Sequence, residues 1–104
     1  MKLIYQNKEI QLRECKSFFS RFRGFMMQKN IRHALLFKKC NSIHTFFMRE
    51  AFDVIFCDED NIVLYYYKNF LPNQVIWPRK NATRVYELPV DYFDIKISSK
   101  LEVE

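Results

Sequence analysis

The chain has 104 residues; 49% are hydrophobic, 17% are aromatic, and one residue, Gly24, is glycine. Phosphate-binding loops of the Walker and Rossmann types need several glycines for tight turns and for close approach of the backbone to phosphate. The composition therefore excludes both classes of nucleotide enzyme, and the length predicts one domain spanning residues 1–104. The net charge of +5 is unevenly spread, because residues 1–49 carry eleven Lys and Arg against Glu9 and Glu14.

The spacing of the cysteines and the length of the apolar runs indicate in which cellular compartment the protein is expected. Cys15, Cys40 and Cys57 show no CxxC spacing, and an odd number of cysteines without such spacing argues against a disulfide framework. Residues 1–10 do not resemble a signal peptide, and no stretch approaches the roughly 20 apolar residues that span a bilayer. We therefore expect a soluble cytoplasmic protein with reduced thiols and no membrane contact.

The first elements predicted along the chain are a β-hairpin and a short helix. Residues 1–5 form the first strand, and residues 9–15 alternate apolar and polar side chains as the second. From Ser17, a suitable N-cap, apolar residues recur at helical spacing. Gly24 sits where a left-handed residue would end a helix, so the helix is predicted near residues 17–24.

After Gly24 the sequence changes to short apolar runs separated by turns. Strand-like composition or alternation occurs at residues 34–37, 43–48, 52–57, 62–67, 74–77, 84–88 and 95–103. The polar residues 58–61 predict a hairpin turn. About seven to nine short strands and one short helix predict a β-rich α+β fold, with a compact, barrel-like antiparallel or mixed sheet.

Polar residues concentrate within the apolar stretch that begins at Cys40. Buried polar groups need hydrogen-bond partners, so we expect His44, Thr45, Arg49 and Asp53 to form one cluster, with Asp53 paired to Arg49. A few polar groups among many apolar ones are typical of a ligand pocket.

The same stretch gives weak support for metal or nucleophilic chemistry. Cys40 and His44 on one strand would lie about 13 Å apart, too far to chelate one ion, so we expect no metal and no cofactor. Nucleophilic catalysis needs Cys or Ser beside a base that a third group holds. A hydrolase with His44 as general base and Asp53 orienting it stays as an alternative, although we favour a protein that is not an enzyme.

Basic residues of the N-terminal half suggest a second alternative, the binding of single-stranded nucleic acid. Proteins of that class combine cationic grooves with aromatic stacking platforms, and Trp77 stands beside Pro78, Arg79 and Lys80. The cations of this surface would be Arg21, Arg23, Lys29, Arg32, Lys38 and Lys39. Nucleic acid ranks behind a small ligand or a protein as the expected partner, because most aromatic residues here are typical of a core.

Several segments of the chain together resemble one family pattern. They are Ser42-Ile43-His44-Thr45-Phe46-Phe47-Met48-Arg49 with Asp53-Val54-Ile55-Phe56, Arg21-Phe22-Arg23-Gly24-Phe25-Met26, Leu35-Leu36-Phe37 and Glu87-Leu88-Pro89. The chain thereby resembles the bacterial and archaeal family called domain of unknown function 192. The resemblance implies a compact, barrel-like, β-rich domain with a short helix, and no established activity. The chain departs from the family pattern at Glu50-Ala51-Phe52, and it has Asp91 and Ser99 where relatives commonly carry glycine.

These observations predict a small, uncharacterised, non-enzymatic binding or accessory module with a pocket around residues 42–49 and Asp53. The candidate binding residues are His44, Thr45, Arg49, Asp53 and Glu87, with Trp77 at the rim.

Overall fold

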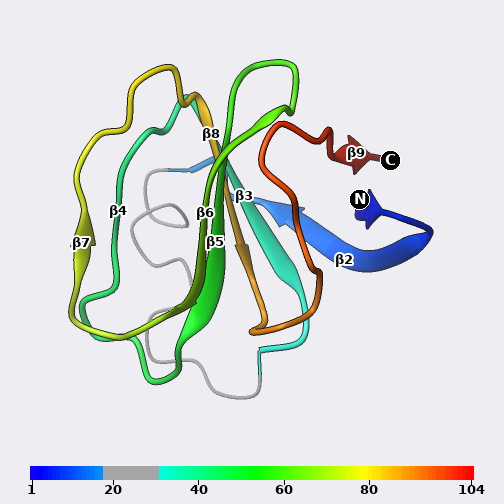
Figure 1. Cartoon of the computed structure of the whole chain (residues 1–104). Coiled ribbons are helices and arrows are strands. Elements are labelled where there is room, and N and C mark those ends of the chain that lie inside the picture. Colours follow the sequence, from blue (N-terminus) through cyan, green and yellow to red (C-terminus); the bar gives the residue numbers. More distant parts are fainter. Residues whose placement is uncertain (18–30) are drawn as a thin grey trace.

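The computed structural model describes residues 1–17 and 31–104, which form nine strands (Figure 1). The strands are β1 (Lys2–Tyr5), β2 (Lys8–Glu14), β3 (Ala34–Lys38), β4 (Ile43–His44), β5 (Phe52–Cys57), β6 (Val63–Phe70), β7 (Val75–Ile76), β8 (Arg84–Leu88) and β9 (Glu102–Val103). Seven strands join in one sheet in the order β6-β5-β8-β3-β2-β1-β9, and β4 pairs with β7. The sheet is mixed, because β2 and β3 run parallel while its other neighbours run antiparallel.

The seven-stranded sheet curls until the start of β6, one of its edge strands, reaches the segment that precedes β9, the other edge strand. The Val63 N–H donates to the Ser99 carbonyl at 2.9 Å, the Ser98 N–H to the Val63 carbonyl at 2.8 Å, and the Leu101 N–H to the Asn61 carbonyl at 3.0 Å. These bonds tie the start of β6 to the segment before β9. The curled sheet encloses apolar side chains that we call the inner cluster, which includes Leu3, Ile10, Leu36, Ile55, Tyr86, Leu88, Phe93 and Leu101.

The opposite face of the sheet carries a second core. Side chains alternate between faces along a strand, so β3, β5 and β8 each contribute to both cores, and all six residues of β5 are buried. The second core, called the outer cluster, includes Leu35, Phe37, Met48, Val54, Phe56, Ile76 and Val85. Figure 1 shows β4 and β7 side by side, apart from the large sheet, and Ile76 of β7 packs into the outer cluster.

Turns in this chain use asparagine where glycine is usual. Ten non-glycine residues of the described part have positive φ, and five of them are Asn, the side chain that tolerates this region because it can bond locally. Asp91, where relatives commonly carry glycine, keeps a left-handed conformation with φ of 60°. Ser99 is the second position where relatives commonly carry glycine. There the left-handed residue is the preceding one, Ser98, with φ of 73°.

The predicted α+β class is wrong for the part of the chain that the structure describes. Residues 1–17 and 31–104 contain strands and turns and no helix, so the described fold is an all-β half-barrel. The helix predicted near 17–24 lies outside the described residues, apart from Ser17. The β-rich, barrel-like mixed sheet is confirmed. The strand predicted at 43–48 is shorter, because the Met48 N–H bonds to the Thr45 carbonyl at 3.2 Å and closes a turn.

Candidate functional site

A two-stranded arm, residues 43–49 and 71–77, carries most of the polar motif singled out in the sequence. Its strands β4 and β7 pair antiparallel, with His44 opposite Val75. Ile76 faces the outer cluster and is 2% exposed. Because side chains alternate along a strand, Val75 and its partner His44 face away from the sheet. The arm therefore has a buried inner side and a solvent-facing outer side.

Thr45 fixes the two strands of the arm to each other. Its fully buried hydroxyl donates to the Leu71 carbonyl at 2.8 Å and accepts the Gln74 N–H at 2.7 Å. Its backbone N–H donates to the Gln74 carbonyl at 2.8 Å, and its carbonyl accepts the Asn73 N–H at 2.9 Å. Thr45 is predicted as a binding residue, but its hydroxyl, N–H and carbonyl groups all form hydrogen bonds inside the arm.

The outer side of the arm is apolar and exposed. Trp77, one residue beyond β7, is 71% exposed. The exposed Phe46 ring stacks on the His44 ring, with 5.3 Å between centroids. Of the eight exposed large hydrophobic side chains in the described residues, five belong to the arm, namely Phe46, Phe47, Leu71, Val75 and Trp77. Exposed large apolar side chains that gather on one element of a soluble protein are typical of interaction sites.

Phe47 combines exposure with an unfavourable backbone conformation. It follows Phe46 in the turn closed by Met48, its φ is 65°, and its side chain is 65% exposed. A left-handed conformation costs a residue with a Cβ about 1–2 kcal/mol, and a bulky side chain there is an outlier. Burial offsets little of that cost for a ring so exposed. Strain of this kind persists mainly at functional sites, and sequence patterns do not reveal it.

Asp53 lies at the start of β5 on the face of the inner cluster and is 1% exposed. Its Oδ1 accepts the Asn69 N–H at 2.8 Å, and its Oδ2 accepts the Asp91 N–H at 3.0 Å and the Tyr66 hydroxyl at 3.5 Å. Burial raises the pKa of the Asp53 carboxyl, and the two N–H donors oppose this shift. Both N–H donors belong to left-handed residues, so Asp53 secures two turns. The expected ion pair with Arg49 is absent from the contacts of Asp53, and Arg49 is exposed.

Glu87 is the fourth of the five residues of β8 and lies on the face of the outer cluster. It stands opposite Val54 on one neighbouring strand and Leu35 on the other, and both belong to that cluster. Glu87 is 4% exposed, and its Oε1 has no hydrogen-bond partner among the described residues. Burial raises the pKa of Glu87 to about 8, so the protonated form predominates at neutral pH.

The structure does not bring His44 and Asp53 together. Asp53 lies on the inner-cluster face and bonds to the groups named above, whereas His44 belongs to the arm that packs on the opposite face. Glu87 is separated from Asp53 by the thickness of the sheet. Burial also raises the pKa of the Cys57 thiol to about 12, which disfavours the reactive thiolate. Within residues 1–17 and 31–104, the groups of the predicted hydrolase are dispersed.

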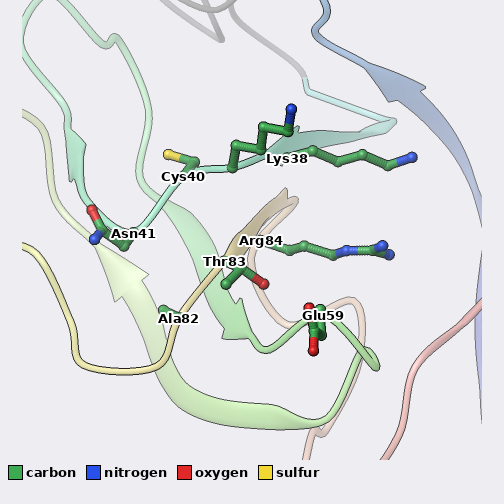
Figure 2. A pocket seen from close by; sticks show the side chains of 8 residues that line it. Lys38, Cys40, Asn41, Glu59, Ala82, Thr83 and Arg84 are labelled. Atoms are coloured by element: carbon green, nitrogen blue, oxygen red, sulfur yellow. The ribbon is translucent and has the colours of Figure 1, made fainter.

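A basic pocket of about 490 Å³ lies where β3 ends and β8 begins (Figure 2). Figure 2 shows Cys40 and Asn41 on one side of this pocket and Arg84 and Glu59 on the other. The polar side chains that line it are those of Lys38, Lys39, Asn41, Glu59, Thr83 and Arg84. Lys38 and Lys39 belong to the cationic surface predicted from the sequence, whereas Arg84 does not, because nothing in the local sequence shows that β8 pairs with β3.

Within the described ranges, no three His, Cys, Asp or Glu side chains are placed to hold a metal ion. None of the three cysteines is in a disulfide. The described part has no helix long and apolar enough to cross a membrane.

Curated relatives of this chain come from archaea of the genus Thermococcus. A UPF0127 protein of Thermococcus sibiricus is 36% identical over 97 residues, which are 85% of this chain and 62% of the relative. A UPF0127 protein of Thermococcus kodakarensis is 39% identical over 80 residues, 71% of this chain and 50% of the relative. The chain therefore spans about half to three fifths of the length of these relatives.

Two solved structures share the fold at low sequence identity. A putative transcription regulator from Sinorhizobium meliloti has a TM-score of 0.81 and 16% identity, over 97% of this chain and 89% of the other. A protein of unknown function from Novosphingobium aromaticivorans has a TM-score of 0.80 and 15% identity, over 98% of this chain and 82% of the other. Because the model of DUF192, a family described as "Uncharacterized ACR", matches residues 2–103, the chain belongs to this uncharacterised family, as its central motif predicts.

Proposed function

We propose that this protein is a non-enzymatic binding module that holds an apolar segment of a partner protein against the outer side of the arm. The observation that carries the proposal is the gathering of five exposed large hydrophobic side chains on this one two-stranded element. An arm that only closed the outer cluster would need apolar residues on its inner side alone. The apolar outer side therefore supports contact with another molecule.

The make-up of the outer side favours a protein as the partner. Protein interfaces are enriched in Trp, Phe and Arg, and their hot spots cluster around aromatic anchors. Trp77, Phe46 and Phe47 supply such anchors. Arg49, the last residue of segment 43–49, is exposed. Two residues after Trp77, the Arg79 Nε–H donates to the Tyr67 hydroxyl at 2.9 Å, which orients a second arginine.

The arm is also fixed before any partner binds. The hydrogen bonds of Thr45 join its two strands, and Ile76 and Met48 anchor its inner side in the outer cluster. A pre-ordered surface loses little conformational entropy on association. Among the predicted binding residues, His44, Arg49 and Trp77 would then contact the partner, while Thr45 would hold the surface in place.

The placement of the acidic residues supports a role other than catalysis. A general base must reach the proton that it abstracts. Asp53 is engaged by backbone N–H groups, and Glu87 is enclosed in an apolar cluster. The three cysteines, none in a disulfide, support a reducing compartment such as the cytoplasm.

Selection from a random 12-residue peptide library on the immobilised protein tests this function. We expect enrichment of peptides with aromatic or aliphatic anchors. Since Trp77 is the only tryptophan, binding should shift its fluorescence to shorter wavelength. Trp77→Ser should weaken binding at least about tenfold, the effect typical of an aromatic hot spot.

The matched control is Ile97→Ser, because Ile97 is 55% exposed but lies outside the arm. This variant should bind the selected peptides like the wild type. Failure to enrich any peptide, or equal affinity of wild type and Trp77→Ser, would refute the proposed function. Circular dichroism would verify that both variants fold.

A further inference from the structure

We infer that the basic pocket between β3 and β8 binds the phosphate group of a small phosphorylated ligand. This inference uses residues outside the arm and does not depend on the proposed function. Its starting point is a pair of like charges, Lys38 and Arg84, that stand opposite each other on neighbouring strands and both line the pocket.

The first observation is the register of β3 and β8. Lys38 stands directly opposite Arg84 in this antiparallel pair. Directly opposite residues have Cβ atoms about 4.5–5.5 Å apart, and like charges at such positions are destabilising. Lys38 is partly balanced by Glu14, at 3.6 Å, but Lys39 adds a third cation next to the pair. Lys39 is exposed and has no ion-pair partner in the described part of the chain.

The second observation is that Arg84 is held in position. Its Nη1–H donates to Asn61 Oδ1 at 3.3 Å, and the same oxygen accepts the Tyr86 hydroxyl at 2.7 Å. The left-handed conformation of Asn61, with φ of 62°, presents this side chain from the hairpin tip. A guanidinium has five N–H donors, so the hydrogen bonds of Arg84 to Asn61 and Tyr86 leave further donors for a ligand.

The third observation is the distribution of charge. Lys38, Lys39 and Arg84 are the cations that line the pocket, and Glu59 is the carboxylate among the lining residues. Because Lys38 also pairs with Glu14, which is outside the lining, three cations against two carboxylates leave one positive charge for an anion to neutralise.

Phosphate is the anion that fits these groups best. Arginine binds phosphate through two parallel N–H···O bonds, and lysine contributes a point charge. A volume of about 490 Å³ lies within the range of small-molecule sites and exceeds what one oxyanion fills. The hydroxyl of Thr83 and the amide of Asn41 offer hydrogen bonds to the remainder of the ligand.

Calorimetric titration with inorganic pyrophosphate at low ionic strength tests the inference. We expect saturable binding to the wild type and a rise in its melting temperature, because a ligand of the native state stabilises it. Arg84→Gln should weaken binding at least about tenfold, since it removes charged hydrogen bonds. Lys96→Gln, which removes an exposed cation elsewhere, should bind pyrophosphate like the wild type.

The inference is overturned if pyrophosphate does not bind saturably, or if Arg84→Gln and Lys96→Gln weaken its binding equally. It is also overturned if citrate binds as tightly as pyrophosphate, because the site would then be an unselective cationic surface. A single-stranded oligothymidylate of 12 nucleotides separates the sources of phosphate. Tighter binding of this oligonucleotide than of pyrophosphate, lost in Arg84→Gln, would assign the pocket to a nucleic-acid phosphate and overturn the inference of a small ligand. If pyrophosphate binds and the oligonucleotide does not, the pocket is assigned to a small phosphorylated ligand.

Discussion

Two buried carboxyl groups, those of Asp53 and Glu87, lie on adjacent strands and have opposite environments. Asp53 meets two backbone N–H groups and a tyrosine hydroxyl, which satisfy its charged form. Glu87 stands between Val54 and Leu35 and has an oxygen without a hydrogen-bond partner in the described part of the chain. Burial of an unpaired charge is costly unless the group is neutral. The Glu87 side chain therefore makes folding sensitive to pH.

Stability is expected to fall as the pH rises through the titration of Glu87. Its pKa is about 8 in the folded state against an ordinary value of 4.5. Between these values the unfolded chain releases a proton that the folded chain retains, so the unfolded state gains stability. The contribution of Glu87 to the free energy of unfolding is fully present below about pH 4.5. It then falls by up to about 1.4 kcal/mol per pH unit until about pH 8.

Urea unfolding of wild type and Glu87→Gln at pH 5, 6 and 7 measures this effect. The free-energy difference between wild type and variant should shift in favour of Glu87→Gln as the pH rises. Glu102→Gln, at an exposed position of β9, is the control and should show no such trend. A difference that stays constant from pH 5 to pH 7 would contradict the assigned pKa.

At the scale of elements, the arm depends on one hydroxyl. Thr45→Val keeps the size of the side chain but leaves the Leu71 carbonyl and the Gln74 N–H without their bonds to Oγ1. Burying such groups unpaired costs about 1–3 kcal/mol. We expect a loss of that size in the free energy of unfolding, with faster hydrogen exchange at the Gln74 amide.

Thr45→Ser retains the hydroxyl and should lose less stability, and Thr83→Val, at an exposed threonine, should lose almost none. If Thr45→Val leaves both the stability and the exchange of Gln74 unchanged, Thr45 does not hold the arm together.

The strands that the sequence predicts best are the most buried ones. The bounds 52–57 and 84–88 agree with β5 and β8, because continuous or alternating apolar runs reflect burial directly. Prediction is weakest at 43–48, where an apolar run becomes a turn with a left-handed Phe47. Nothing in the local composition favours positive φ for phenylalanine, so the exposed surface of the arm could not be foreseen.

At the scale of the whole molecule, the candidate site depends on register. Val54 stands opposite Glu87, so Asp53 and Glu87 point to opposite faces of the sheet; a shift of one residue would place them on the same face. The register results from pairing between strands about 30 residues apart, which one sequence does not reveal. For the same reason, only the folded structure shows that Lys38 stands opposite Arg84.

The central claim is that the outer side of the arm exists to bind a partner, and Phe47 tests it most directly. Phe47→Gly removes an exposed side chain and relieves a left-handed conformation that costs about 1–2 kcal/mol, less the entropy that glycine loses on folding. The variant should therefore be at least as stable as the wild type. The decisive measurement is its affinity for peptides selected on the wild-type arm. We predict a loss of at least about tenfold without loss of stability, and unchanged affinity would contradict the claim.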